Sequence, residues 1–401
     1  VNCVYVAPGN AGTATEAKLQ NIDLDPLDIA GLATFATENN CALTVIGPEA
    51  PLVAGIVDYF TAAGLPCFGP TRGAAQLEGS KSFSKDFLAR HHIPTAAYAV
   101  FSELDPALAY VREQGAPIVV KADGLAAGKG VIVAMTLEEA EEAIRDMLAD
   151  NKFGDAGAQV VIEGFLEGEE ASFIVMVDGD NVLPMATSQD HKRIGDGDTG
   201  PNTGGMGAYS PAPVVTALVY QRIMERVILP TVKGMAEEGH SYTGFLYAGL
   251  MIDADDNPSV IEFNCRFGDP ETQPILQRLQ SDLVSHCQSA LEGTLDTAVA
   301  QWDPRPAVGV VLAAGGYPNA YEKGHAIAGL DTPWPATTKV FHAGTQTQDG
   351  NIVTHGGRVL CVSALGNTIE EAIQLAYAGV DHINWQDMIF RQDIGWRAID
   401  R

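Results

Sequence analysis

Basic residues are scarce in this sequence. Its 401 residues include 24 Lys and Arg against 51 Asp and Glu, which gives a formal net charge of −27. Affinity for nucleic acids and for anionic membrane surfaces comes largely from Lys and Arg that lie against phosphate groups. The sequence therefore predicts neither nucleic acid nor membrane as a partner. A small anionic ligand stays compatible with this charge, because a pocket can be locally basic on an acidic protein.

Long apolar runs and paired cysteines are also missing. No stretch reaches about 18 uninterrupted apolar residues, the length that a membrane-spanning helix requires. No basic segment followed by an apolar one marks a secretion signal. The six cysteines form no C-x-x-C pair and several lie in apolar runs, which predicts buried, reduced thiols rather than a structural zinc site. We expect a cytoplasmic monomer.

The first 79 residues predict a parallel α/β domain. Short apolar strands alternate with helical stretches, the pattern of a sheet whose parallel strands are joined by helices. Strands are expected at 1–7, 43–46 and 66–69, and helices at 26–39 and 52–63. No strand with a glycine turn precedes residue 1, so we expect that this domain lacks an opening βα unit of about 20–25 residues.

The rest of the chain predicts α+β units. Residues 94–180 alternate between short strands and helices and include the capping box Thr136–Glu139. The polar, glycine-rich stretch 186–213 predicts a long loop, which is uncommon unless it is functional. Composition shifts near 302–306, and a small separate α+β domain follows. The predicted fold class is therefore α/β and α+β, with domains at 1–79, 80–304 and 305–401.

One candidate for a phosphate-binding loop follows a predicted strand that ends at Lys121. The segment KADGLAAGKG, residues 121–130, has small residues that let backbone N–H groups approach a phosphate, and a lysine that adds charge. Its glycine spacing is wrong for a Walker A loop, Gly130 stands where Ser or Thr is needed, and the segment joins two strands. From these residues alone, a flexible hairpin is equally compatible.

Acidic residues follow another predicted strand, in IEGFLEGEE at 162–170. Carboxylates at this point could accept a hydrogen bond from an adenine amino group or bind ribose hydroxyls, although the pattern also fits a solvated acidic loop. The segment QDHKR at 189–193, with the glycine-rich turn at 200–207, mixes an acid, basic residues and free N–H donors. Such a mixture is typical of a binding site for a zwitterionic or phosphorylated ligand, and we favour this interpretation over a mobile surface loop.

The segment VIEFNCRFGDPET, residues 260–272, predicts a metal site. Strand alternation puts Glu262 and Asn264 on one face, and Arg266 follows on that side if the strand continues. Two oxygen ligands on one face suit Mg²⁺, which takes one or two protein groups together with phosphate oxygens. The histidines are scattered and no G-x-S-x-G occurs, so a hydrolase triad has no support.

These segments occur in the order found in ATP-grasp ligases. Longer strings closely resemble the glycinamide ribonucleotide synthetases, the ATP-grasp ligases of bacterial purine synthesis, over the whole chain. These strings are GPEAPL (47–52), EGSK (78–81), KADGLAAGKGV (121–131), SQDHKR (188–193), GPNTGGMGAYSP (200–211) and IEFNCRFGDPETQ (261–273).

The resemblance implies a Rossmann-like N-terminal domain, an ATP-grasp core with a lid at about 99–169, and a small C-terminal domain. It implies the ligation of glycine to 5-phosphoribosylamine with cleavage of ATP. ATP would phosphorylate the glycine carboxylate, and the amine would then attack the acyl phosphate and release phosphate. Such a reaction needs no protein nucleophile, so positioning and charge neutralisation would carry the catalysis.

Residue by residue, the resemblance implies an ATP site. Lys81 and Lys121 match lysines that contact the nucleotide phosphates. Gly124, Gly128 and Gly130 match the loop that closes over those phosphates.

The adenosine and metal contacts are implied in the same way. Glu163 and the backbone of Leu166 match the pair that binds adenine, and Glu170 matches the acid that binds ribose. Glu262 and Asn264 match ligands of Mg²⁺, for which Mn²⁺ could substitute.

For glycine and phosphoribosylamine, the resemblance implies Asp190, Lys192 and the turn that contains Gly204 and Gly205. Arg266 matches an arginine that stabilises the acyl phosphate and the tetrahedral species after it. Together with Lys121, Asp190 and Arg266 are the implied catalytic residues.

Three other interpretations stay open. The chain could be a different ATP-grasp carboxylate–amine ligase, such as a carboxyaminoimidazole synthetase, but the string at 188–211 is particular to the glycine ligases. It could be an inactive nucleotide-binding module, against which Lys121, Glu262, Asn264 and Arg266 argue. It could be a structural protein, against which the glycine-rich loop of mixed charge argues.

Overall fold

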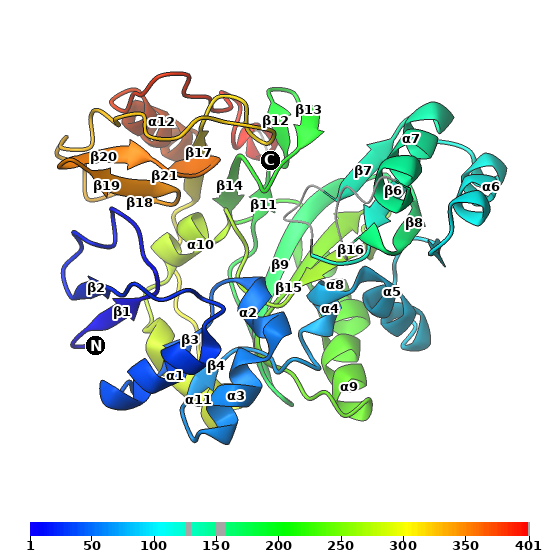
Figure 1. Cartoon of the computed structure of the whole chain (residues 1–401), viewed down its shortest axis with the longest axis horizontal. Helices are drawn as coiled ribbons and strands as arrows, with labels where there is room; N and C mark the ends of the chain where they lie inside the picture. The colour runs from blue at the N-terminus through cyan, green and yellow to red at the C-terminus, as the bar shows by residue number, and fades with distance from the viewer. Residues whose placement is uncertain (126–129, 150–156, 400–401) are drawn as a thin grey trace.

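A four-stranded antiparallel sheet forms the centre of the molecule, and three smaller units surround it (Figure 1). The computed structural model describes residues 1–125, 130–149 and 157–399. The order of the central sheet is β10 (Val182–Pro184), β9 (Glu169–Asp178), β15 (Thr243–Ile252) and β16 (Pro258–Asn264).

Both faces of the central sheet are covered, which explains the uninterrupted apolar sequence of its two long strands. Alternate residues of β9, such as Phe173 and Val175, pack with the helical layer of α8 (Ala217–Ile223), η2 (Met224–Ile228) and α9 (Leu229–Glu237). The residues between them, such as Ile174, pack on the other face with α11 (Leu283–Glu292) and η3 (Leu295–Thr297). The predicted helix over 273–291 is in fact two helices, α11 and the shorter α10 (Thr272–Arg278).

The N-terminal unit contains two pairs of parallel strands, as the sequence predicts for a parallel α/β domain. The pairs are β1 (Val4–Val6) with β2 (Leu19–Asn21), and β3 (Thr44–Val45) with β4 (Cys67–Phe68). Its helices are α1 (Ile29–Glu38), α2 (Glu49–Ala54), α3 (Ile56–Ala62) and α4 (Gln76–Gly79). Helix α5 (Lys81–Arg90) follows directly after this unit. One helix was expected over 52–63, but Gly55 adopts a φ of 94° and separates α2 from α3. The sequence pattern also missed β2.

A second antiparallel sheet carries two helices on the outer side of the molecule (Figure 1). Its order is β5 (Tyr98–Phe101), β8 (Val160–Gly164), β6 (Ile118–Ala122) and β7 (Val131–Ala134), and its helices are α6 (Leu104–Gln114) and α7 (Leu137–Leu148). The predicted capping box is confirmed, because Thr136 and Glu139 each accept a hydrogen bond from the backbone N–H of the other.

The C-terminal sheet corrects one prediction. Residues 186–213 were expected to form a loop, but they contain β11 (Gln189–Asp190), β12 (Arg193–Gly195), β13 (Thr199–Asn202) and β14 (Gly207–Ser210). The first and last of these join β17 (Ala307–Ala313), β21 (Arg358–Leu365) and β18 (Thr338–His342) in one sheet, packed with α12 (Ile369–Val380). The remaining elements are β19 (Thr345–Gln348), β20 (Asn351–Thr354) and η4 (Trp396–Ala398). β14 pairs with β17, about 100 residues away, and this pairing is not revealed by any local pattern. β11 pairs with β14, and β12 pairs with β13.

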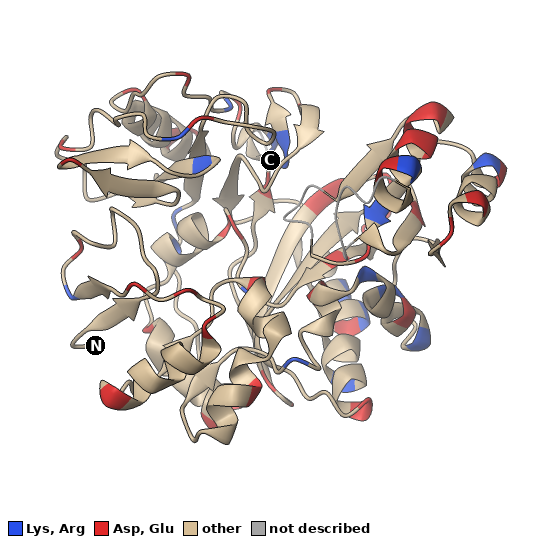
Figure 2. Cartoon of the chain, in the orientation of Figure 1, with Lys and Arg blue, Asp and Glu red and all other residues tan. Residues whose placement is uncertain are grey.

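Acidic residues are common along the helices, clearly so on α7 (Figure 2). Within the described part of the chain, no helix has the length and apolar character to cross a membrane.

A buried carboxylate joins the N-terminal unit to the end of β16. Glu78 of α4 accepts a hydrogen bond of 2.6 Å from the backbone N–H of Cys265, and its other oxygen lies 3.2 Å from the guanidinium of Arg266. Burial raises the pKa of Glu78 to about 7, although the charge of Arg266 opposes this shift.

The raised pKa of Glu78 predicts a loss of stability as the pH rises. Between pH 4.5 and about 7 the folded protein keeps a proton that the unfolded chain releases. Its free energy of unfolding therefore falls over this interval, by up to about 3 kcal/mol from this one group. We expect Glu78→Gln to reduce that slope in urea unfolding at pH 5, 6 and 7. Glu103→Gln, at an exposed site, is the control, and an equal slope in all three proteins would contradict the assignment.

Gly244, at the start of β15, lets the N-terminal unit approach the central sheet closely. Its φ is 144°, and a Cβ there would lie 2.8 Å from Cδ of Pro70 and 3.1 Å from the carbonyl carbon of Gly69. We expect Gly244→Ala to destabilise the protein by about 2–4 kcal/mol, because strain and overlap with backbone combine. Gly64→Ala is the matched control, since φ is 71° with no atom within 4 Å, and should cost about 1 kcal/mol. Equal shifts in the urea midpoint would show that the close approach is unimportant.

Candidate active site

A cavity of about 830 Å³ lies where the central sheet meets the other three units, and it collects most of the predicted site residues. Its walls come from the N-terminal unit, the outer antiparallel sheet, parts of the 188–207 segment and the end of β16. The predicted residues that line it are Lys81, Lys121, Gly130, Glu163, Leu166, Glu170, Asp190, Lys192, Gly204, Glu262, Asn264 and Arg266.

A buried ion-pair chain forms one end of this cavity. The carboxylate of Glu163 lies 2.9 Å from Nζ of Lys121 and 2.7 Å from Nζ of Lys85, and all three side chains are 3–4% exposed. Lys121 also donates a hydrogen bond of 2.9 Å to the carbonyl of Ile261, and Lys85 donates one of 2.6 Å to Thr95. These contacts fasten the outer sheet, through β6 and β8, to β16 and to α5.

Lysine is in excess at this end. Lys81, at the first position of α5, donates a hydrogen bond of 2.9 Å to the carbonyl of Gly124. Burial lowers the pKa of Lys81, and it lowers that of Lys85 to about 8 even though Glu163 is adjacent. This end of the cavity collects three ammonium groups, of which those of Lys85 and Lys121 pair with Glu163, and this makes it a place for an anionic ligand.

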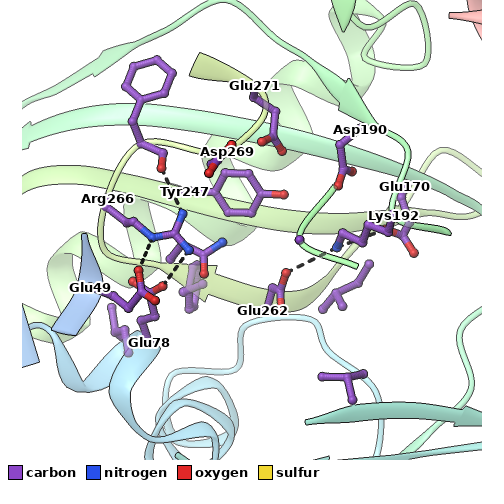
Figure 3. Close-up of a pocket in the computed structure, with 18 of the residues that line it drawn as sticks. Glu49, Glu78, Glu170, Asp190, Lys192, Tyr247, Glu262, Arg266, Asp269 and Glu271 are labelled. Carbon is purple, nitrogen blue, oxygen red and sulfur yellow. Dashed lines mark hydrogen bonds and ion pairs between the residues drawn. The ribbon is translucent and has the colours of Figure 1, made fainter. Parts of the chain in front are cut away.

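Lys192 crosses the middle of the cavity and pairs with two carboxylates (Figure 3). Its Nζ lies 3.2 Å from Glu170 and 3.3 Å from Glu262. Burial opposes the charge of Lys192, but the two carboxylates raise its pKa well above the ordinary value. In turn Lys192, with Lys121 and Lys81, lowers the pKa of Glu262 to about 2 in spite of burial. Glu262 is therefore a carboxylate held ionised among three lysines.

Glu262 and Asn264 lie on the same strand of the cavity wall. They pair with Gly249 and Tyr247 of β15, and a bulge interrupts the register just before Glu262. Both residues line the cavity, as strand alternation predicts. Within 1–125, 130–149 and 157–399, no group of three or more His, Cys, Asp or Glu side chains is arranged to hold a metal ion. Protein oxygens here can therefore supply only part of a coordination shell.

Arg266 does not continue the face of Glu262 and Asn264, because β16 ends at Asn264. Its side chain turns toward the N-terminal unit instead, where its Nε lies 2.9 Å from Glu49 and its NH2 group 3.2 Å from Glu78 (Figure 3). The guanidinium still lines the cavity. The prediction of a shared side depended on a strand that continues to Arg266, and this condition is not met because β16 ends at Asn264.

Only some of the predicted glycines line the cavity. Gly204 lines the cavity, and its N–H donates to the hydroxyl of Tyr317 while its carbonyl accepts from Arg358 at 2.6 Å. Gly205 lies behind it with a φ of 110°. Gly124 does not line the cavity, and its carbonyl receives Lys81. Gly128 is outside the described residues.

Glu271, Tyr247 and Lys85 are among the side chains of the cavity that sequence reasoning missed. Glu271 and Tyr247 lie deep in the wall near Asp190, and Lys85 supports Glu163. Tyr247 lies in an apolar strand, and the sequence therefore predicts a core position for it. Lys85 lies four residues after Lys81 on one helix, a spacing that places both on one face, and this signal could have identified it.

The chain matches the family described as phosphoribosylglycinamide synthetase in three parts. The N domain matches residues 1–78, the ATP-grasp (A) domain 79–272 and the C domain 307–397. It is similar to the phosphoribosylamine–glycine ligases of Vibrio cholerae, with 70% identity over all of this chain and 94% of that protein, and of Pseudomonas syringae, with 68% identity over all of this chain and 93% of that one.

Solved structures give the same picture. The crystal structure of the phosphoribosylamine–glycine ligase of Thermotoga maritima has a TM-score of 0.83 and 34% identity, covering 98% of this chain and 93% of that one. The biotin carboxylase domain of Hydrogenobacter thermophilus 2-oxoglutarate carboxylase, in complex with MgADP and bicarbonate, has a TM-score of 0.74, covers 97% and 86%, and at 16% identity shares only the fold. By sequence and by structure, the chain belongs to the phosphoribosylglycinamide synthetase family, with its N, ATP-grasp and C domains.

Proposed function

We propose that this chain catalyses the ATP-dependent ligation of glycine to 5-phosphoribosylamine, giving glycinamide ribonucleotide, ADP and phosphate. This is the activity of the relatives that cover its whole length. The observation that carries the assignment is that twelve residues predicted for the ATP, metal and substrate sites line a single cavity. The N, ATP-grasp and C domains all contribute to its walls.

ATP occupies the lysine-rich end in this proposal. Lys81 and Lys121 neutralise the phosphates, Glu163 and the backbone of Leu166 receive adenine, and Glu170 binds ribose. Gly124, Gly128 and Gly130 belong to the loop over the phosphates. The outer unit of β5 to β8 with α6 and α7, about residues 99–169, acts as a lid. Support comes from the ammonium groups of Lys81, Lys85 and Lys121, which gather at this end of the cavity, the last two paired with Glu163.

Glu262 and Asn264 would hold Mg²⁺ or Mn²⁺. One carboxylate and one amide oxygen, on one strand and in the cavity wall, fit a hard cation that takes its other ligands from phosphate and water. The low pKa of Glu262 keeps that ligand ionised at neutral pH. When bound, the ion supplies charge neutralisation to the phosphates. Lys192, which is paired with Glu262, would have to release it.

The chain's own groups orient two successive attacks. A glycine carboxylate oxygen attacks the γ-phosphorus of ATP and ADP leaves. The amine of phosphoribosylamine then attacks the acyl carbon, loses a proton, and expels phosphate. Arg266, held by Glu49 and Glu78, stabilises negative charge on the acyl phosphate and the tetrahedral species. Asp190, Lys192 and the turn at Gly204 and Gly205 hold the two substrates.

A different ATP-grasp carboxylate–amine ligase is the alternative assignment. It would use the same nucleotide end and a different acid or amine. The chain is about 70% identical to glycine ligases over its whole length, which includes the segment 188–211. Residues of this segment line the cavity, and this favours glycine and phosphoribosylamine as the substrates.

The assignment predicts that phosphate is released from ATP and Mg²⁺ only when both glycine and freshly generated phosphoribosylamine are present. Each substrate is omitted in turn as a control, and glycinamide ribonucleotide is identified by mass. Turnover with another carboxylate in place of glycine, at equal or greater kcat/KM, would overturn the assignment in favour of the alternative.

The metal assignment predicts a strong effect of Glu262→Gln. The variant loses the only charged ligand, so we expect kcat/KM to fall at least about 100-fold and the Mg²⁺ concentration for half-maximal rate to rise. The measurement is a Mg²⁺ titration at fixed ATP. Glu167→Gln, at an exposed position close to Leu166, is the matched control. An unaltered Mg²⁺ titration in Glu262→Gln would remove Glu262 from the metal site.

A further inference from the structure

A segment near the end of the described chain, residues 391–397, lies against the hairpin of β12 and β13. We call it the tail segment. At the tip of the hairpin the contacts are reciprocal. The N–H of Gly197 donates a hydrogen bond of 2.8 Å to the carboxylate of Asp393, and the N–H of Gln392 donates one of 2.8 Å to the carboxylate of Asp196.

Two arginines of the tail segment share one carboxylate of the hairpin. Asp198 lies 2.7 Å from the NH1 group of Arg391 and 2.5 Å from the NH2 group of Arg397. Arg391 is fully buried and also pairs with Asp393, at 2.7 Å. The tip of the hairpin is therefore tied to the tail segment by ion pairs as well as by backbone hydrogen bonds.

The same two arginines reach the base of the hairpin. Arg397 donates a hydrogen bond of 3.1 Å to the backbone carbonyl of Asp190, and Arg391 donates one of 3.2 Å to the backbone carbonyl of Arg193. These two carbonyls lie on either side of Lys192 in the sequence. The tail segment therefore holds the main chain before and after a residue that crosses the cavity.

The hairpin itself gives Lys192 little support. Strands β12 and β13 form a separate two-stranded sheet, and their register shifts between Arg193 and Gly195. A ribbon of two short strands is marginally stable by itself. At its base the carbonyl of Lys192 accepts hydrogen bonds of 2.8 Å from the N–H and the hydroxyl of Thr203, and both residues line the cavity. Contacts from outside the hairpin must therefore fix the position of its base.

The arginine network is better suited to fixing geometry than to adding stability. Burying Arg391 with its carboxylates carries a desolvation cost that such pairs repay poorly. A guanidinium is planar and its donors have fixed directions, so it defines where its acceptors lie. The side chain of Lys192 is long and flexible, and its ammonium group must lie between Glu170 and Glu262. That requires a main chain held in one position.

We propose that Arg391 and Arg397 are positioning residues that hold Lys192 in place across the cavity. This inference rests on the proposed function, in which Lys192 helps to hold the two substrates. Neither arginine is among the described residues that line the cavity. Both therefore act through the main chain of residues 190–193 and not on a ligand.

The test compares wild type with Arg397→Gln in the complete ligase reaction. Arg397 is partly exposed, which makes it a safer site for substitution than Arg391. We expect kcat/KM for glycine and for phosphoribosylamine to fall about 10-fold, because a displaced group orients its substrates poorly. The KM for ATP should stay within about two-fold of wild type, since the tail segment does not contact the lysine-rich end.

Two further variants calibrate this result. Arg397→Lys keeps the charge beside Asp198 but lacks the guanidinium fork, so it should recover only part of the loss. Arg305→Gln is the matched control. It breaks an ion pair of 2.7 Å between an arginine and Asp303 without touching the tail segment, and it should leave kcat/KM unchanged.

A double-mutant cycle with Lys192→Met separates positioning from general damage. If Arg397 acts through Lys192, Arg397→Gln lowers kcat/KM about 10-fold alone and less than two-fold in the Lys192→Met background. Urea unfolding of the same proteins should show an equal change in stability in both backgrounds. Lys192→Arg is the background if Lys192→Met has no measurable activity. If Arg397→Gln does not fold, Asp198→Asn replaces it, since Arg391 then keeps its pair with Asp393.

Three outcomes overturn the inference. They are an unchanged kcat/KM in both Arg397→Gln and Asp198→Asn, an equal fall of kcat/KM in the two backgrounds, and a KM for ATP that rises as much as those for the other substrates. Each of these results, in a wild type that needs both glycine and phosphoribosylamine for phosphate release, leaves the proposed function intact. A wild type that does not need both overturns the proposed function as well.

Discussion

Paired charges around one cavity hold this protein together. Lys121 and Lys85 join the outer sheet to β16 and α5 through Glu163, and Arg266 joins the end of β16 to the N-terminal unit through Glu49 and Glu78. A buried charge that loses its partner costs several kcal/mol, so each of these contacts resists separation of the units that it joins. The proposed substrate-binding surface therefore also carries contacts that join the domains.

This dual use means that ligand binding is an exchange of partners. The ammonium group of Lys192 lies 3.3 Å from Glu262 and neutralises its charge. A cation that binds Glu262 would have to replace this ammonium group. A divalent ion at Glu262 would set Lys192 free, and its ammonium would then be available to an anionic group such as a substrate carboxylate. Because removing one partner from a buried pair is unfavourable, release of Lys192 and arrival of its new partner would be coupled.

Local sequence signals were sufficient where the structure depends on local geometry. The capping box at Thr136 and Glu139, the alternation of Glu262 and Asn264 along one strand, and the long apolar strands of the central sheet could all be predicted. The strands at 189–210 could not, because β14 pairs with residues 307–310, β11 pairs with β14, and β12 pairs with β13. The break of the helix at Gly55 depends on one backbone angle that the sequence leaves free.

The site was predictable to the same degree. The resemblance to a known family implied the nucleotide and metal groups, but the sequence could not reveal which charges neutralise one another, since Lys192 and Glu262 are 70 residues apart. The place of Glu271 in the cavity could not be predicted for the same reason. It stands among polar residues that follow a strand, and only the fold buries it beside Asp190 and Tyr247.

The distribution of charge within the cavity resolves the apparent conflict between an acidic chain and an anionic substrate. A net charge of −27 would repel ATP if it were spread evenly, but Lys81, Lys85 and Lys121 are gathered and partly desolvated at one end. Asp190 and Glu271 lie elsewhere in the same wall. Each of these regions favours ligand groups of the opposite charge. The field of the cavity, rather than any one nucleophile, would then set the direction of the reaction.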